Sequence, residues 1–252
     1  MTVTAPLIVA HRGASADLAE HTLAAYRLAV DQGADGLECD VQLTRDRVVV
    51  CQHDGRVDRT SDGTGYVSLL SSAQLSRMDF GSWHRNPRPQ LGPLRLDDLL
   101  DLVKQTGVRL FLETKQPNLF GGLLERAVVD TLRRHGLAEA TEQIIPMSFS
   151  TMAVRRFHQL APQLTGVLLL NKLSARRLDG GLPSWASITG PGIHLLRADP
   201  DYVRRAARHG HRTYCWTVDE PADIELCERL GVSYLATNHP AQTRAAQSPE
   251  LG

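Results

Sequence analysis

The chain has 252 residues, of which 42% are hydrophobic, and its 28 Lys and Arg residues are balanced by 28 Asp and Glu residues. This composition excludes a largely disordered chain. The zero net charge excludes a general attraction to nucleic acid or anionic membranes, while a local positive pocket stays open. Because no apolar run approaches the roughly 18–20 residues of a transmembrane helix, we expect no integral membrane segment.

The N-terminus and the cysteines both favour a cytoplasmic protein. The opening sequence MTVTAPLIVAHRGA lacks the basic region and the full apolar segment of a signal peptide. Cys39 neighbours Glu38 and Asp40 and is expected to point to the opposite face, whereas Cys51 is expected to share the face of His53, which argues against a disulfide between the two cysteines. We expect reduced core thiols, since no CxxC spacing links the four cysteines Cys39, Cys51, Cys215 and Cys227.

The chain begins with a predicted strand at residues 7–11 and a helix that Thr22 caps and Gly33 ends. A predicted hairpin follows. Residues 55–95 are then rich in Gly, Ser, Pro and polar residues without a strong period, and we interpret them as an insertion. Beyond them helices at 96–107, 123–135, 150–160, 174–178, 199–210 and 221–230 alternate with strands at 108–113, 143–149, 165–170, within 188–195, at 212–218 and at 233–237.

This alternation favours one fold class. Strands that are apolar on both faces are typical of a parallel sheet covered by helices. We therefore predict an α/β architecture, a single (β/α)8 TIM barrel over residues 1–252 with 55–95 as an insertion within it. An open doubly wound sheet is the competing architecture, but no Gly-rich dinucleotide fingerprint follows the first strand.

The stretch DGLECDVQLTRDRVVVCQHD predicts two short antiparallel strands joined by a tight turn. A turn centred on residues 45–46 makes Glu38 face His53, and a turn centred on 46–47 makes Asp40 face His53. Because side chains alternate along a strand, both registers place these three residues on one face. One hairpin thus gathers two carboxylates and an imidazole.

Polar residues recur where the predicted strands end, which is where functional residues of such barrels lie. Four strands contribute them: His11 and Arg12, then Glu38 and Asp40 with His53 beside them, then Glu113 and Lys115, and finally Trp216 and Asp219. We expect these side chains to meet in one site.

The residue types indicate a metal-assisted reaction on a phosphate. Glu38, Asp40 and Glu113 offer hard oxygen donors, which suit Mg²⁺ or Ca²⁺, with Mn²⁺ as a further candidate, better than Zn²⁺. Arg12 and Lys115 suit an anionic substrate.

Two histidines on separate strands suit proton transfer. One of His11 and His53 could take a proton from the attacking oxygen while the other gives one to the leaving oxygen. The metal and the two cations would neutralise the charge of the transition state. The predicted reaction is metal-assisted cleavage of a phosphodiester.

At this point the sequence closely resembles the glycerophosphodiester phosphodiesterase family. The blocks AHRGAS, EHTLAAY, GADGLECDVQLTRDRVVVCQHD and DRTSDGTG resemble its signature region, and FLETK, SFS and YCWTVDEP resemble its later blocks. The resemblance implies a (β/α)8 barrel that hydrolyses a small-molecule glycerophosphodiester to sn-glycerol 3-phosphate and an alcohol. It implies one divalent cation on Glu38, Asp40 and Glu113, His11 and His53 as the catalytic acid and base, and phosphate contacts from Arg12 and Lys115.

Two further residues are candidates for contact with the substrate. Glu20 belongs to a segment similar to the family's PENT motif, directly after HRG, and Trp216 could pack against the glycerol moiety. The chain departs from the family pattern at four positions: His21 stands in place of asparagine, Arg47 in place of a common turn glycine, Asp219 in place of asparagine and Asn238 in place of aspartate. His21 is expected to be a neighbour of the site rather than an extra ligand.

Two other functions stay open at this stage. The first is a lyase-like phosphodiesterase, in which a neighbouring substrate hydroxyl attacks phosphorus and a cyclic phosphate is released. The second is a non-catalytic glycerophosphodiester-binding barrel, which the departures at His21 and Asn238 motivate.

Overall fold

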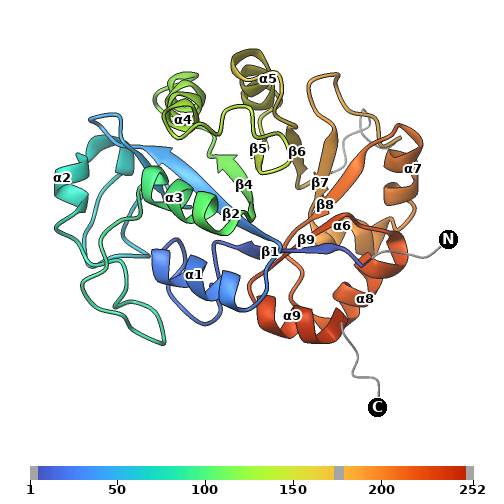
Figure 1. The fold of residues 1–252 in the computed structure, drawn as a ribbon, viewed down its shortest axis with the longest axis horizontal. Helices are drawn as coiled ribbons and strands as arrows, with labels where there is room; N and C mark the ends of the chain where they lie inside the picture. The colour runs from blue at the N-terminus through green and yellow to red at the C-terminus, as the bar shows by residue number, and fades with distance from the viewer. Residues whose placement is uncertain (1–4, 173–178, 248–252) are drawn as a thin grey trace.

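Eight parallel strands close into a barrel in the computed structural model, which describes residues 5–172 and 179–247 (Figure 1). The barrel closes because β1 pairs in parallel with both β2 and β9. A ninth strand, β3, adds to β2 as an antiparallel neighbour. The predicted (β/α)8 barrel is therefore confirmed, with the strands β1 Leu7–His11, β2 Gly36–Leu43, β3 Val49–Cys51, β4 Arg109–Thr114, β5 Ile144–Ser148, β6 Val167–Leu170, β7 Ile188–Pro191, β8 Arg212–Cys215 and β9 Tyr234–Thr237.

Helices form an outer ring around these strands (Figure 1). The helix that begins after Gly192 and the helix at the C-terminal end were not predicted, and the predicted helix at 174–178 lies outside the described residues. Gly107 and Gly231 end two of the helices in the left-handed conformation that glycine adopts readily. The helices are α1 Leu23–Asp31, α2 Ser72–Leu75, α3 Leu96–Thr106, α4 Leu123–Arg134, α5 Thr151–Leu160, α6 Ile193–Ala198, α7 Tyr202–Arg208, α8 Pro221–Leu230 and α9 Pro240–Gln247.

The inside of the barrel is filled by apolar side chains. Phe111 stacks on Tyr214 with a centroid distance of 5.0 Å and meets Tyr234 edge-on at 5.0 Å. Val9, Val167 and other inward strand residues complete this cluster. Alternate strand residues point outward and pack against the helices. The filled interior leaves a functional site only at a mouth of the barrel.

The hairpin is where our prediction of register was wrong. Val41 pairs with Cys51, and Leu43 with Val49, so the register lies between the two that we predicted. A three-residue loop joins the strands instead of a two-residue turn, as in hairpins where a type I turn is followed by a left-handed residue. Arg47 is that residue, with φ at 63°.

This register also corrects the predicted faces of the cysteines. Cys51 shares the core face of Cys39, and both are buried in one apolar cluster. All four cysteines are free and buried, as predicted. His53 does not share the face of Cys51, because β3 ends at Cys51 and the chain turns before His53.

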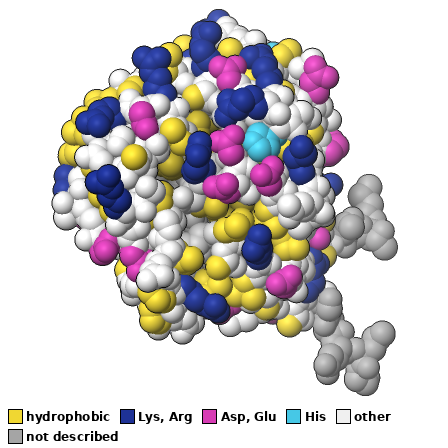
Figure 2. Space-filling model, turned by 60° about the vertical axis from the view of Figure 1, so that its left-hand side comes forward, with side chains coloured by type: hydrophobic (Ala, Val, Ile, Leu, Met, Phe, Trp, Pro, Cys, Tyr) yellow, Lys and Arg dark blue, Asp and Glu magenta, His cyan; other side chains and the backbone are white. Residues whose placement is uncertain are grey.

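Residues 55–95 form a small structure of their own beside β3. A 3₁₀ helix at Val67–Leu69 and helix α2 are its regular elements, and Ser71 and Gln74 form a capping box at the start of α2. Val57, Val67, Leu75 and Phe80 pack together with Val50 of β3. On the side of the molecule that carries α2, positive and negative side chains are interspersed (Figure 2). Among the described residues, no helix is long and apolar enough to cross a membrane.

Candidate active site

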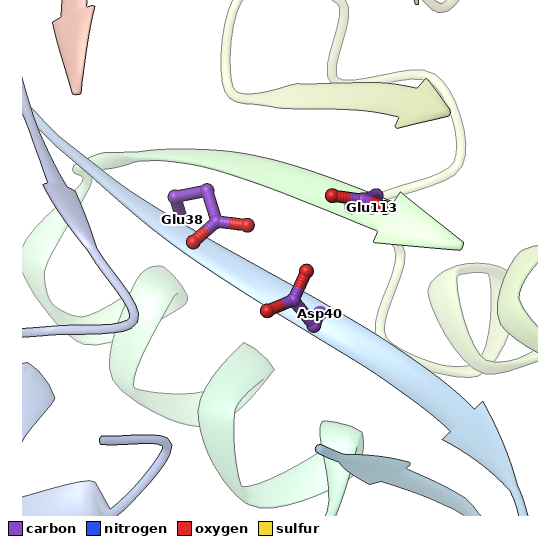
Figure 3. Close-up of side chains that lie close together, drawn as sticks. All are labelled: Glu38, Asp40 and Glu113. Carbon is purple, nitrogen blue, oxygen red and sulfur yellow. The ribbon is translucent and has the colours of Figure 1, made fainter. Parts of the chain in front are cut away.

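Strand register brings the three carboxylates together. Asp40 of β2 lies directly across from Glu113 of β4, and Glu38 lies two residues earlier on the same face of β2. Their carboxyl groups point into one space (Figure 3), with one oxygen from each within 4.8 Å of the others. All three side chains are buried, with residue exposures of 1% for Glu38, 1% for Asp40 and 6% for Glu113.

The end of β1 turns sharply to place Arg12 against this cluster. Arg12 has φ at 60° and Gly13 has φ at 84°. A Cβ atom on Gly13 would lie 2.8 Å from the backbone carbon of Ala25, so only glycine fits there. The backbone N–H of Arg12 donates to Oε2 of Glu38 at 3.0 Å, which holds that carboxyl in place.

Two cations and a histidine surround Asp40. Lys115 Nζ lies 2.9 Å from Oδ1 of Asp40 and 2.9 Å from Oε1 of Glu113. Arg12 Nε lies 3.1 Å from Oδ2 of Asp40, and His21 Nε2 lies 3.0 Å from the same oxygen. Asp40 is therefore the best-compensated carboxylate of the cluster.

The three carboxyl groups have pKa values shifted in different directions, downward for Asp40 and upward for Glu38 and Glu113. Burial opposes ionisation of Asp40, but Lys115 and His21 outweigh it and hold its pKa well below the usual range. Burial and then the charge of Asp40 raise the pKa of Glu113 to about 8, and the same two causes raise the pKa of Glu38 well above its usual range. The cluster thus carries more acidic groups than its cations can compensate, which makes it compatible with a divalent metal ion.

The two catalytic candidates line one cavity from different segments: His11 ends β1, and His53 lies on the loop after β3. That cavity is also lined by Arg12, Glu38 and Lys115. Glu113 is a further lining residue, and Asp40 lies beside it in the acidic cluster, so these residues meet at one mouth of the barrel, whereas Asp219 does not line the cavity.

His53 is held by its neighbours on the loop after β3. Its Nδ1 donates to Oδ1 of Asp54 at 2.7 Å. Gln42 of β2 donates to the carbonyl oxygen of His53 at 3.1 Å, which fixes the loop itself. Burial is the main cause that lowers the pKa of His53.

Glu20 lies behind the cavity and is not among its lining residues. Its carboxylate accepts hydrogen bonds from Arg12 Nη1 at 3.1 Å and from Arg59 Nη2 at 2.7 Å. Arg59 also donates to Asp54 Oδ2 at 2.6 Å. A chain of charge pairs therefore runs from Arg12 through Glu20 and Arg59 to the aspartate that holds His53.

Apart from Trp216, the apolar wall of the cavity was not predicted from the sequence. Trp216, which was predicted, lines it beyond the end of β8, and Phe149 packs against Trp216 edge-on at 5.3 Å. The indole N–H of Trp216 donates to the carbonyl oxygen of Gly190 at 2.8 Å. The other apolar lining residues are inward strand positions with no chemical signal beyond their spacing: Met147, Leu169 and Tyr214.

Comparison with known proteins decides the family. A family model described as "Glycerophosphoryl diester phosphodiesterase family" matches residues 11–242. The chain belongs to this phosphodiesterase family. A Mycobacterium tuberculosis protein named "Probable glycerophosphodiester phosphodiesterase 1" is 43% identical over 95% of this chain and 92% of that protein. A Bacillus subtilis "Glycerophosphodiester phosphodiesterase" is 33% identical over 93% of this chain and 84% of that protein.

Solved structures share the fold of this family member. A glycerophosphodiester phosphodiesterase from Agrobacterium tumefaciens is 25% identical with a TM-score of 0.81, covering 95% of this chain and 99% of the other. An Oleispira antarctica phosphodiesterase, solved in complex with the product sn-glycerol-3-phosphate, is 23% identical with a TM-score of 0.85 over 96% of both chains.

His21, the first departure from the phosphodiesterase pattern, is buried against the acidic cluster. Tyr26 donates its only hydroxyl hydrogen to the carbonyl oxygen of Glu38 at 3.0 Å. The contact of 2.8 Å between Nδ1 of His21 and the Tyr26 hydroxyl therefore has Nδ1 as its donor. His21 thus bridges Tyr26 and Asp40, as a neighbour of the carboxylates.

Asp219 and Asn238, two further departures, form one unit with His11. Asn238 donates through Nδ2 to Oδ2 of Asp219 at 2.6 Å, and its backbone N–H donates to Oδ1 of Asp219 at 2.8 Å. The amide oxygen of Asn238 then faces His11, whose Nδ1 lies 2.8 Å away. Burial, followed by the charge of Arg12, lowers the pKa of His11 to about 4.

Proposed function

We propose that this protein hydrolyses glycerophosphodiesters to sn-glycerol 3-phosphate and an alcohol with the help of one divalent cation. The observation that carries the proposal is the single cavity lined by two imidazoles, a guanidinium, an ammonium and two carboxyl groups. Membership of the phosphodiesterase family supports the same reaction.

The residues Glu38, Asp40 and Glu113 would hold the cation. Their oxygen donors fit Mg²⁺, Ca²⁺ or Mn²⁺, and a divalent charge would offset the burial and the repulsion from Asp40 that raise the pKa values of Glu38 and Glu113. When bound, the cation supplies charge stabilisation to the phosphoryl oxygens as a Lewis acid.

The remaining roles belong to side chains of this chain. Arg12 and Lys115 bind and orient the phosphate and neutralise its developing charge. His11 and His53 each commit Nδ1 to a neighbouring oxygen, so Nε2 is the ring atom left to exchange protons. One imidazole activates the attacking water and the other protonates the leaving alcohol.

The test is a panel of glycerophosphodiesters with choline, ethanolamine, glycerol and inositol headgroups, each assayed for glycerol 3-phosphate with Mg²⁺, Ca²⁺ and Mn²⁺. We expect His11→Ala and His53→Ala each to lower kcat by about 10²–10⁴-fold. Both variants should retain metal affinity. Absence of turnover with every headgroup and metal would overturn the proposal. Phosphorus NMR of the early product tests the lyase alternative, because a cyclic phosphate that persists would contradict direct hydrolysis.

A further inference from the structure

Arg59, in the segment 55–95, holds two carboxylates that lie behind the candidate active site. Its Nη1 and Nη2 donate to the two oxygens of Glu20, at 2.9 Å and 2.7 Å, and its Nε donates to Oδ2 of Asp54 at 2.6 Å. Arg59 itself is not among the residues that line the active-site cavity. The guanidinium therefore joins two acidic side chains without facing the place where a substrate would bind.

Each of the two carboxylates also holds a residue of the active site. Oδ1 of Asp54 accepts from Nδ1 of His53 at 2.7 Å, and Oε1 of Glu20 accepts from Nη1 of Arg12 at 3.1 Å. Both His53 and Arg12 line the cavity, one from the loop after β3 and the other from the end of β1. Arg59 is thus one carboxylate removed from an acid–base candidate on one side and from a phosphate-binding candidate on the other.

Arg59 also keeps both carboxylates ionised. Burial opposes the charge of Glu20 and of Asp54, and in each of them the hydrogen bond from Arg59 is the largest of the causes that outweigh burial. The pKa of Glu20 falls to about 2, and the pKa of Asp54 falls below its usual range. An ionised carboxylate has enough lone pairs to accept from Arg59 and from the active-site residue at the same time.

The segment 55–95 fixes Arg59 on both sides. The next residue, Thr60, accepts a hydrogen bond through Oγ1 from the buried side chain of Gln52 at 2.9 Å. The guanidinium lies 5.9 Å from the ring centroid of Trp83, whose indole N–H donates to the carbonyl oxygen of Phe80 at 2.9 Å. A side chain that is already ordered loses less conformational entropy when it orients its partners.

We propose that Arg59 is a positioning residue for the hydrolysis. Through Asp54 it orients His53 for proton transfer. Through Glu20 it orients Arg12 toward the phosphate. The inference rests on the proposed function, since Arg59 itself takes no part in the chemistry. An exposed ion pair contributes little to stability, so the role of Arg59 lies in the geometry that it imposes. The segment 55–95 thereby contributes to catalysis from outside the cavity.

Steady-state kinetics on a headgroup that the panel shows to be turned over separates the two sides of Arg59. Asp54→Ala should lower kcat by up to about 100-fold with little change in KM, because proton transfer depends on where His53 lies. Glu20→Ala should raise KM by about tenfold, because Arg12 loses a hydrogen bond to a charged group. Arg59→Ala should do both. Wild-type kcat and KM in Arg59→Ala would overturn the proposal.

A background test shows whether Arg59 acts through the two carboxylates. Arg59→Ala should cost no further activity in a protein that already carries Asp54→Ala and Glu20→Ala, because the groups that it holds are gone. A loss as large as in the wild-type background would overturn the proposal. Arg56→Ala is the matched control, since Arg56 lies in the same segment, is 47% exposed against 44% for Arg59, and pairs with Asp58. This control should keep wild-type kcat and KM.

Chemical rescue distinguishes orientation from a general loss of stability. Because the side chain of Arg59 is 44% exposed, free guanidinium can reach the space that Arg59→Ala leaves. Millimolar guanidinium should recover part of kcat, whereas sodium ions offer no donors and urea offers no charge. Arg59→Lys should also recover part, because one ammonium group can hold one of the two carboxylates. Equal recovery by sodium, or no recovery by either guanidinium or lysine, would overturn the proposal.

Two measurements that need no turnover separate this inference from the proposed function. Nitrogen NMR should show His53 with its proton on Nδ1 in the wild type and a mixture of tautomers in Arg59→Ala. Calorimetry with sn-glycerol 3-phosphate should show about tenfold weaker binding to the variant. Both changes, in a protein that hydrolyses no glycerophosphodiester, would support the contacts of Arg59 and overturn the proposed function. Neither change, in an active protein, would overturn the role of Arg59 and leave the proposed function standing.

Discussion

Asn238 presents its side-chain oxygen to His11 at 2.8 Å, and Asp219 leaves it no other orientation. Asp219 accepts hydrogen bonds from both the side-chain and the backbone nitrogen of Asn238, so a flipped amide would set two oxygens against each other. The nitrogen Nδ1 of His11 must therefore carry a proton. This protein reaches that result with an amide next to the histidine and a carboxylate behind it.

Exchanging the two side chains tests this relationship. We expect Asn238→Asp alone to lower kcat by about 10–100-fold, because it sets two carboxylates against each other and removes the orientation of His11. Asp219→Asn should lower kcat less, because it only frees the amide to flip. The double variant restores one amide and one carboxylate and should recover most of the lost kcat.

A comparison of kcat, KM and the free energy of unfolding for the three variants is the measurement. KM should change little, since neither residue is among those that line the active-site cavity. A double variant whose fold-loss in kcat equals the product of the two single fold-losses would show that the residues act independently, contrary to this prediction.

Removing one carboxyl charge should have opposite effects with and without metal. Glu38→Gln is expected to stabilise the metal-free protein, because burial and Asp40 penalise the charge of Glu38. The same variant should lose at least about tenfold in affinity for Mg²⁺, Ca²⁺ or Mn²⁺. Metal at about 100 times its dissociation constant should stabilise the wild-type protein by about 2.7 kcal/mol, and EDTA should remove this stabilisation.

Calorimetry and urea unfolding with and without EDTA measure both effects. Glu113→Gln serves as the companion variant, since Glu113 supplies a carboxylate to the same cluster. Unchanged metal binding in both variants would show that the ligands are assigned wrongly.

His21→Ala should weaken metal binding although His21 is not expected to be a ligand. The variant removes the hydrogen bond that holds Oδ2 of Asp40 and leaves the Tyr26 hydroxyl without its buried donor. We expect a loss of about 10–100-fold in metal affinity and about 1–3 kcal/mol in the free energy of unfolding. His21→Gln, whose amide can still donate to Asp40, should recover part of the affinity. If the alanine variant binds metal like wild type, the bridge has no role in holding Asp40.

Acid should destabilise the protein partly through Glu20. Burial opposes its charge, but hydrogen bonds from Arg59 and the charges of His21 and Arg12 outweigh burial and lower the pKa of Glu20 from 4.5 to about 2. A lowered folded-state pKa contributes stability above pH 4.5, and this contribution is lost as the pH falls from 4.5 to 2. We expect it to be roughly 2–3 kcal/mol, because the half-exposed Arg59 is screened by solvent.

Urea unfolding of wild type and Glu20→Gln at pH 6 and pH 3 measures this contribution, with both values chosen to bracket the titration of a carboxylate. The wild-type protein should be more stable than the variant at the higher pH, and the difference should shrink at the lower pH. If the difference in free energy of unfolding between wild type and variant were the same at both pH values, Glu20 would not have a lowered pKa in the folded protein.

The sequence by itself determined the architecture and the identity of the polar site residues. Glycines 107 and 231, the period of the apolar residues and the polar residues after four of the strands were enough to predict a barrel with His11, Glu38 and Lys115 at one mouth. These signals are local, because propensity and alternation act over a few residues, and the barrel then converts position along a strand into position in space.

Tertiary structure alone decided what the polar residues touch. The loop of the hairpin set a register that alternation could not choose, because Val48–Cys51 is apolar at every position and a slip of one residue, which exchanges the faces of the strand, leaves the hydrophobic pattern unchanged. The contact between His11 and Asn238 joins the first and last strands, 227 residues apart, and only closure of the barrel brings it about. The apolar wall at Phe149 carries no chemical signature in the sequence, since an apolar side chain becomes a binding surface only when its neighbours leave it uncovered.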